Sequence, residues 1–196
     1  MNGLDREHLH SSTPTSTSEC TTAHRNRVNG PDIDTEHAAL SAFLTAQRQS
    51  VLAIIDGLRE DELRQAVVPS GWTPLGMIEH LAHAERYWFQ HVVSGRVGEV
   101  PWPAFEADDE AGPFAGIHAT DAVLAFYRHQ CALSDAVLAA TPLAAEPRGA
   151  PTPDMADLAG DVRTVVLHMI EETARHADHL DIARELIDGR TGLGPR

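Results

Sequence analysis

The sequence predicts an all-α protein, a four-helix bundle with long crossover connections. Four segments repeat apolar residues at the i, i+3, i+4 spacing of an amphipathic helix, and no segment alternates apolar and polar residues as a half-buried strand does. Two long connections rich in proline, glycine or alanine separate these helices, as in bundles with crossovers. The chain has 196 residues, of which 42% are hydrophobic, and this suffices for one core with tails.

The first 34 residues are rich in serine and threonine and show no periodicity. We therefore expect a disordered N-terminal extension at 1–34, ahead of a bundle domain at 35–190. The extension lacks the apolar stretch of a signal peptide and carries acidic residues that a transit peptide avoids, which favours a cytoplasmic protein. The first helix is expected at 35–58, with apolar positions at Leu40, Phe43, Leu44, Val51, Ile54, Ile55 and Leu58.

The second helix has a clear start signal. Thr73 is placed to cap it and Pro74 occupies the first helical position, where a missing N–H costs nothing. The periodic pattern runs to about residue 93. The connection that follows, 94–118, has no period, and a loop of this length in a compact domain is usually functional or mobile.

The last two helices are separated by a proline- and alanine-rich crossover at 142–156. The third helix is expected over 120–140 and ends before Pro142. The fourth is expected over 157–188, with Gly189 just past its last periodic residue as a C-cap.

Charge and cysteine content limit the possible partners. Fifteen basic residues against 29 acidic ones give a formal charge of −14, which repels nucleic acid and anionic lipid. No apolar run approaches the roughly 18 residues that span a bilayer. Cys20 and Cys131 lie far apart and form neither a disulfide framework nor a cysteine-rich zinc motif. A small-molecule substrate is the expected partner, with a monomer and a homodimer equally open.

Two polar residues interrupt the apolar stripe of the last helix. Glu172 and His176 are four residues apart, so their side chains lie one turn above one another. A carboxylate that faces a core is costly unless something compensates it. A metal ion held by both side chains would do so, and a buried hydrogen-bonded Glu–His pair would do so equally.

The second helix offers a third ligand in His80, at the edge of its apolar arc. Three N/O ligands from two helices would leave coordination positions open, as in catalytic metal sites. His80 as a structural residue is the alternative. His83 could replace it in the site, but His83 lies farther toward the polar side of the helix.

Two motifs resemble the metal-binding helices of the DinB-like superfamily of four-helix bundles. The first is Trp72-Thr73-Pro74 followed by Met77-Ile78-Glu79-His80-Leu81-Ala82, and the second is His168-Met169-Ile170-Glu171-Glu172-Thr173-Ala174-Arg175-His176-Ala177-Asp178-His179. The resemblance covers about 35–190. Many members carry His-x-x-x-His in the last helix. Glu172 in the first position is similar to the branch of the mycothiol-dependent maleylpyruvate isomerase metal-binding domain, whose ligands are His, Glu and His.

The resemblance implies that His80, Glu172 and His176 hold a divalent metal, Zn²⁺ in the first place with Ni²⁺ or Fe²⁺ as alternatives. It also implies a low-molecular-weight thiol such as mycothiol as co-substrate, in a transferase or isomerase reaction. The isomerase carries a further C-terminal domain, whereas seven residues follow Gly189 here, and this favours a plain S-transferase or an unrelated chemistry. With the metal at this triad, the 94–118 connection would help to shape the substrate pocket. The alternative function is a non-enzymatic, stress-related or small-molecule binding protein whose metal is structural or absent.

Four neighbouring residues have open roles. His179 is a fourth ligand, a proton carrier or an exposed residue at the rim. Glu85, inside the apolar arc of the second helix, accepts a hydrogen bond from a ligand imidazole or pairs with an arginine such as Arg184. Cys131 is expected to be a buried, unreactive thiol. His168 is expected at the surface.

Overall fold

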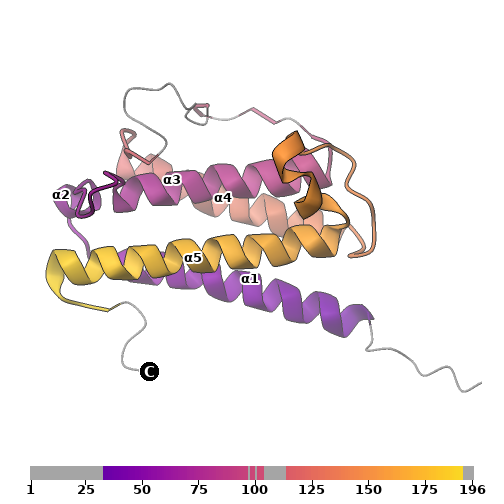
Figure 1. Ribbon diagram of the computed structural model, residues 1–196, viewed down its shortest axis with the longest axis horizontal. Coiled ribbons are helices and arrows are strands. Elements are labelled where there is room, and N and C mark those ends of the chain that lie inside the picture. The colour runs from indigo at the N-terminus through magenta and orange to yellow at the C-terminus, as the bar shows by residue number, and fades with distance from the viewer. Residues whose placement is uncertain (1–32, 97, 100, 104–113, 192–196) are drawn as a thin grey trace, which may run out of the picture. The chain divides into compact units, whose positions relative to one another are not determined.

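The computed structural model describes residues 33–96, 98–99, 101–103 and 114–191, which form helices and loops with no strand among them. The bundle consists of α1 (Ile33–Ile55), α3 (Pro74–Glu85) continued by the π-helix η1 (Arg86–Val93), α4 (Thr120–Ala139) and α5 (Val162–Asp188) (Figure 1). Two short elements, α2 (Glu60–Leu63) and the 3₁₀-helix η2 (Pro153–Ala159), lie in connections. This confirms the predicted all-α bundle. The proposed extension at 1–34 lies outside the described residues, except for its last two, which begin α1.

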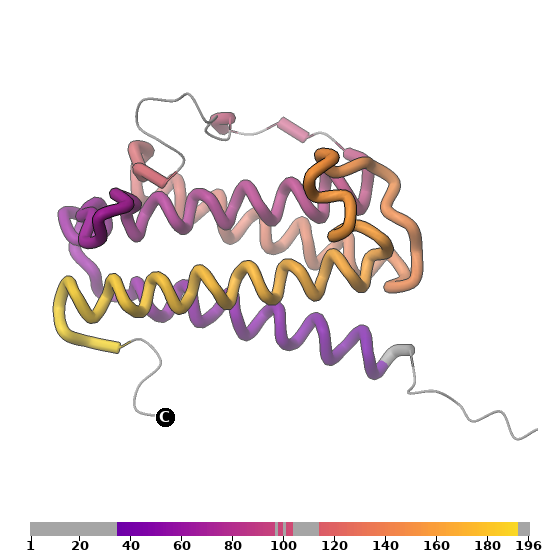
Figure 2. The backbone as a smooth tube through the Cα atoms, viewed as in Figure 1, coloured from indigo at the N-terminus to yellow at the C-terminus, as the bar shows by residue number. Residues whose placement is uncertain are grey.

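Hydrogen bonds fix the directions of the helices. Arg163 at the start of α5 donates to Glu36 at the start of α1 at 2.6 Å, and Arg184 near the end of α5 donates to the carbonyl oxygens of Ile54 and Asp56 at the end of α1. The closely packed α1 and α5 are therefore parallel. Figure 2 shows α3 and α4 side by side and running the opposite way. Because α3 and α4 are parallel, the end of η1 and the start of α4 lie at opposite ends of the bundle.

The end of the last helix agrees with the prediction, and its start does not. Gly189 ends α5 in the left-handed region, with φ of 76°. The predicted start at 157 is wrong, because α5 begins at Val162. The Asp161 carboxylate accepts a hydrogen bond of 2.8 Å from the backbone N–H of Thr164 and so caps the helix there. The residues before it form η2.

The second helix is not the regular α-helix that the sequence predicts. It begins as expected, because the Thr73 hydroxyl accepts a hydrogen bond of 3.1 Å from the N–H of Gly76. After Glu85 it becomes a π-helix, with i→i+5 bonds such as that from Ser94 N–H to Phe89 at 3.0 Å. The wider turn buries the apolar residues Trp88, Phe89, Val92 and Val93.

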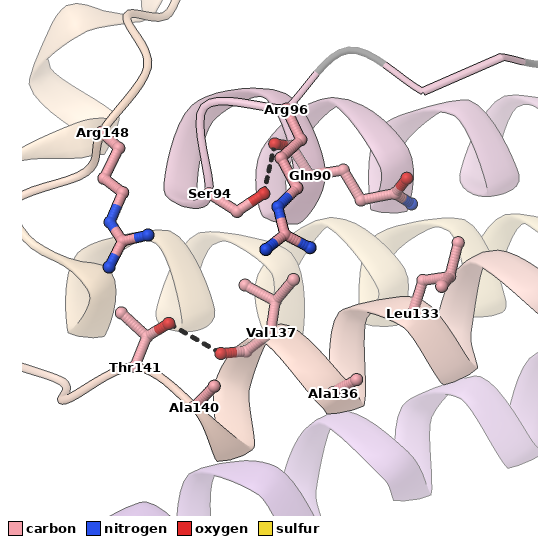
Figure 3. Close-up of a pocket in the computed structure, with 9 residues that line it drawn as sticks. All are labelled: Gln90, Ser94, Arg96, Leu133, Ala136, Val137, Ala140, Thr141 and Arg148. Atoms are coloured by element: carbon pink, nitrogen blue, oxygen red, sulfur yellow. Dashed lines mark hydrogen bonds between the residues drawn. The ribbon is translucent and has the colours of Figure 1, made fainter.

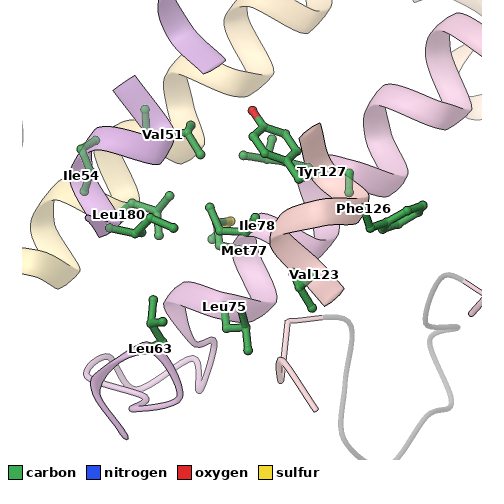
Figure 4. Packing of buried hydrophobic residues seen from close by; sticks show 14 residues of the cluster. Val51, Ile54, Leu63, Leu75, Met77, Ile78, Val123, Phe126, Tyr127 and Leu180 are labelled. Atoms are coloured by element: carbon green, nitrogen blue, oxygen red, sulfur yellow. The ribbon is translucent and has the colours of Figure 1, made fainter. Parts of the chain in front are cut away.

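A buried ionic layer divides the core into two apolar clusters. One cluster, drawn in Figure 4, contains Val51, and the other contains Leu44. Arg48 lies between these two residues on α1. It donates two hydrogen bonds of 2.7 Å to Glu85 of α3 and one of 2.7 Å to Asp135 of α4. Glu85 is 1% exposed, so this bidentate pair fixes α1 against α3 in the middle of the bundle.

The α1 helix is long and apolar enough over Thr35–Ile55 to cross a membrane, by length and composition alone. A core helix passes the same test. The fully buried Leu44 and Val51 show that α1 supplies core residues to this bundle.

Candidate metal site

Three side chains from α3 and α5 converge on one point, as the sequence predicts. The Nε2 of His80 lies 3.2 Å from Oε1 of Glu172, and the Nε2 of His176 lies 2.9 Å from the same oxygen. The potential ligand atoms of the three residues all lie within 4.8 Å of one another, and within the described part of the chain no other cluster of three or more such groups could hold a metal ion. Two imidazole nitrogens and a carboxylate oxygen are a donor set that suits Zn²⁺, Fe²⁺ or Ni²⁺.

The triad is partly open to solvent. The side chains of His80, Glu172 and His176 are 29%, 16% and 11% exposed. The ring of Phe114 covers one side, at 4.7 Å from the ring centre of His80 and 6.3 Å from that of His176. A small molecule can therefore reach these ligand atoms beside an aromatic wall.

The carboxyl group of Glu172 is held in its ionised form. Hydrogen bonds from His176 and then His80 lower its pKa well below the ordinary value, more than partial burial raises it. Its second oxygen lies 3.7 Å from a guanidinium nitrogen of Arg175. Glu172 is thus an anion at neutral pH, as a metal ligand must be.

The contacts with Glu172 indicate which histidine tautomers fit this geometry. A carboxylate only accepts hydrogen bonds, so both Nε2 atoms that contact Glu172 carry a proton. The Nδ1 of His176 is buried and has no hydrogen-bond partner among the described residues. To bind a cation through Nε2, each ring must place its proton on Nδ1. The unpaired Nδ1 is costly, and such a group needs an explanation other than stability.

Comparison with known proteins agrees with this geometry. The sequence model of one protein family, described as mycothiol-S-transferase, matches residues 39–189, which include the whole triad. The chain belongs to the mycothiol-S-transferase family. Searches of curated proteins and of solved structures returned no match. The family carries out metal-dependent transfer of mycothiol to electrophiles, and this favours the S-transferase interpretation over a non-enzymatic binding protein.

In this member of the family, the end of the 94–118 connection is docked on the start of α3. The N–H of Thr73 donates to the carbonyl of Phe114 at 3.0 Å, and the Thr73 hydroxyl donates to that of Ala115 at 3.1 Å. Gly76 makes the close approach possible, because a Cβ there would overlap the Phe114 carbonyl. Gly116 adopts φ of 64°, and a Cβ on it would lie 2.7 Å from the nitrogen of Gly76. Phe114 is thereby fixed beside the triad.

Replacing Gly76 with alanine is expected to displace this segment. The added methyl group cannot fit against the Phe114 backbone, so we expect a loss of about 1–3 kcal/mol in unfolding free energy. Mycothiol transfer should fall as well, because the aromatic wall shifts while the triad stays intact. Denaturation and activity assays measure both effects. Gly160→Ala is the matched control, since its new Cβ would meet nothing closer than 4.0 Å. Equal behaviour of the two variants would contradict the docking role of Gly76.

A second polar pair near the triad escaped the sequence analysis. Glu79, next to His80 in the sequence, is 1% exposed and accepts a hydrogen bond of 2.7 Å from Nδ1 of His118. The His118 ring stacks on Trp102 with ring centres 4.2 Å apart. The position of Glu79 could have been predicted in part from the sequence, because it is a carboxylate between Ile78 and His80 on a helix with a broad apolar face. His118 and Trp102 belong to an aperiodic connection, where the sequence gives no register.

His83 lies outside the triad, and it is more buried than its position toward the polar side of the helix indicates. It is half-buried with its ring centre 5.0 Å from that of Phe126, and its Nε2 is buried without a hydrogen-bond partner in the described structure. Burial, with smaller effects of nearby positive groups, lowers the pKa of His83 from 6.5 to about 4.

This shift predicts acid-sensitive stability. Between pH 6.5 and about 4 the unfolded chain takes up a proton at His83 that the folded chain does not, so stability must fall as the pH drops through this range. The measurement is the urea midpoint of chelator-treated protein at several pH values between 6.5 and about 4. The midpoint of His83→Gln should change less with pH than that of the wild type. The exposed His129→Gln variant should keep the wild-type slope. An unchanged slope in the His83 variant would contradict this assignment.

The structure resolves two of the remaining open roles. His179 is exposed, with its ring centre 5.5 Å from that of His176, and it lies outside the ligand group. Of the two suggestions for Glu85, pairing with an arginine is confirmed, but the arginine is Arg48 and not Arg184. The hydrogen bond from a ligand imidazole is wrong, since none joins Glu85 to the triad among the described residues. Arg184 pairs with Asp188 instead, at 2.9 Å.

Two further expectations concern His168 and Cys131. His168 is not a plain surface residue, since its ring packs edge-on against Trp88 with centres 4.6 Å apart and burial lowers its pKa. Cys131 is the unreactive thiol predicted from the sequence. Burial raises its pKa to about 12, with a further contribution from Glu85.

Proposed function

We propose that this family member holds a divalent ion through His80, Glu172 and His176, with Zn²⁺ as the physiological metal, and uses it to transfer mycothiol to a small electrophile. The observation that supports the site most is the shared contact of two imidazole nitrogens with a single carboxylate oxygen, at 3.2 and 2.9 Å. Family membership and the donor set support the rest of the proposal.

A divalent ion bound there would supply positive charge that keeps a thiol in its thiolate form at neutral pH. The protein residues do the remaining work. Glu172 contributes one negative charge, so a dication at the triad keeps a net positive charge. Phe114 shields one side of the triad from water, and the exposed edges of His80 and Glu172 leave an approach for the two substrates.

The balanced reaction is a substitution at the electrophile. The thiol gives up its proton, a sulfur–carbon bond forms and the bond from that carbon to its leaving group breaks. With 1-chloro-2,4-dinitrobenzene as electrophile, the products are the mycothiol conjugate, chloride and a proton. No oxidant or reductant is required.

The test combines metal analysis with a conjugation assay. Untagged protein should contain about one divalent ion per chain, and a chelator should remove both the ion and the conjugation of mycothiol to 1-chloro-2,4-dinitrobenzene. Added Zn²⁺ should restore activity better than Ni²⁺ or Fe²⁺. His80→Ala should lose metal and activity together, while the rim variant His179→Ala keeps both. Full activity in metal-free protein would refute the proposal.

A further inference from the structure

A pocket of about 210 Å³ lies between η1, the end of α4 and the connection that follows α4 (Figure 3). Its floor is apolar and comes from α4, through Leu133, Ala136, Val137 and Ala140. None of its lining residues is acidic, and none belongs to the triad. Gln90, in its wall, is ten residues beyond His80, which corresponds to roughly 15 Å along a helix. The pocket is thus separate from the candidate metal site.

Two exposed arginines, Arg96 and Arg148, face this pocket. The guanidinium groups of Arg96 and Arg148 point toward it, above Val137 and Thr141 (Figure 3). Within the residues that the structure describes, neither side chain forms an ion pair or a hydrogen bond, whereas Arg48, for example, is fully engaged. In a chain with 29 acidic and 15 basic residues, two unpaired guanidiniums at one pocket without a carboxylate are unexpected.

The backbone fixes both arginines relative to one another. The N–H of Arg148 donates to the carbonyl of Val93 in η1 at 3.1 Å, and the N–H of Arg96 donates to that of Gln90 at 2.8 Å. Gly149 allows this contact, because a Cβ there would overlap a backbone carbonyl of η1. The segment that carries Arg148 therefore packs against the end of η1, three residues before Arg96.

Arg96 and Arg148 are not explained by a structural role in balancing the partial negative charge at the C-terminal ends of helices. The pocket lies at the C-terminal ends of η1 and α4, where positive charge is favourable. However, neither guanidinium donates a hydrogen bond to a carbonyl oxygen of these helices in the described structure. Their planar N–H donors remain available, and such donors match the geometry of a carboxylate or phosphate group.

We propose that this pocket binds a small organic anion, with its oxyanion between Arg96 and Arg148 and its apolar body against the α4 floor. Carboxylates and phosphate monoesters share this chemistry. The proposal is independent of the metal site, because the two share no residue.

The proposal is tested by calorimetric titration of the full-length, metal-loaded protein with benzoate, with phenyl phosphate and with neutral benzamide. At least one anion should bind saturably, and benzamide should not. Binding of phenyl phosphate alone would assign the site to phosphate monoesters, and binding of benzoate alone would assign it to carboxylates. Arg96→Gln and Arg148→Gln should each weaken binding about tenfold or more, as expected for loss of a hydrogen bond between charged groups.

The matched control is Arg128→Gln, which should leave the affinity unchanged. Arg128 is another exposed arginine, on α4 outside this pocket, and its side chain has no hydrogen bond or ion pair among the described residues. Neither pocket variant should change mycothiol transfer or the melting temperature of the unliganded protein. Absence of saturable binding by both anions would overturn the proposal. So would binding that survives in the Arg96/Arg148 double variant, since the anion would then occupy the metal or another site.

Discussion

Replacing Glu172 with glutamine is expected to lower metal affinity by on the order of 100-fold or more, and to abolish mycothiol transfer at limiting metal. Glutamine keeps the size of the side chain but removes the only negative charge among the three proposed ligands. Loss of a group that merely supports a ligand already costs about 10–100-fold, so loss of the charged ligand should cost at least as much. Competition titration with a chromogenic chelator measures the affinity.

The metal-free variant should change little in stability. From the sequence alone, Glu172 is a carboxylate facing the core without a partner, and replacing it with glutamine is expected to stabilise the metal-free protein or leave it unchanged. In the structure, however, Glu172 accepts hydrogen bonds from two histidines and its pKa is lowered. Its contribution is present above the ordinary pKa and is lost as the pH falls through the folded value. Glutamine can still accept one of these hydrogen bonds, so a loss below about 1.5 kcal/mol is expected.

The control is Glu171→Gln, which alters the exposed neighbour that pairs with Arg175. It should bind metal like the wild type. Melting curves with chelator and with added Zn²⁺ complete the comparison. If Glu172→Gln loses the same stability under both conditions, the Glu172–His176 contact is purely structural and the metal site is wrong.

Features set by local sequence were predictable. Thr73 and Gly189 end their helices as expected because capping depends on a few adjacent residues. The Glu172–His176 contact follows from the four-residue spacing in the same way. The start of α5 was misplaced because the apolar pattern continues into η2, and the cap at Asp161 decides where the α-helix begins.

Features set by packing between distant segments were not predictable. The position of Phe114 depends on how an aperiodic connection docks against Gly76, although glycine inside a helix already indicates a close backbone approach. Glu85 required a cation, and its position on the helix did not distinguish Arg184 of α5 from Arg48 of α1. That choice depends on which helix faces the second helix at mid-height. It is therefore set by the packing of all four helices and not by the sequence of the second helix alone.

Replacing Arg48 with methionine is expected to cost about 3–5 kcal/mol of unfolding free energy, a large part of the 5–15 kcal/mol typical of a domain. Glu85 is 1% exposed and receives two hydrogen bonds of 2.7 Å from this guanidinium. Methionine fills similar space but leaves the carboxylate buried without its counter-ion. Urea denaturation of metal-free protein measures the loss.

Two further variants test whether the loss of stability in Arg48→Met comes from the unpaired charge on buried Glu85 or from the loss of the arginine side chain itself. Asp135→Asn weakens the third contact of Arg48, but the Asp135 side chain is 60% exposed, so the cost should stay below about 1 kcal/mol. In the double variant Arg48→Met/Glu85→Leu no unpaired charge remains in the core, and most of the lost stability should return, because apolar residues can replace a buried ion pair at little cost. A double variant as unstable as Arg48→Met alone would contradict this account, since the loss would then come from the packing of the arginine side chain rather than from the uncompensated charge on Glu85.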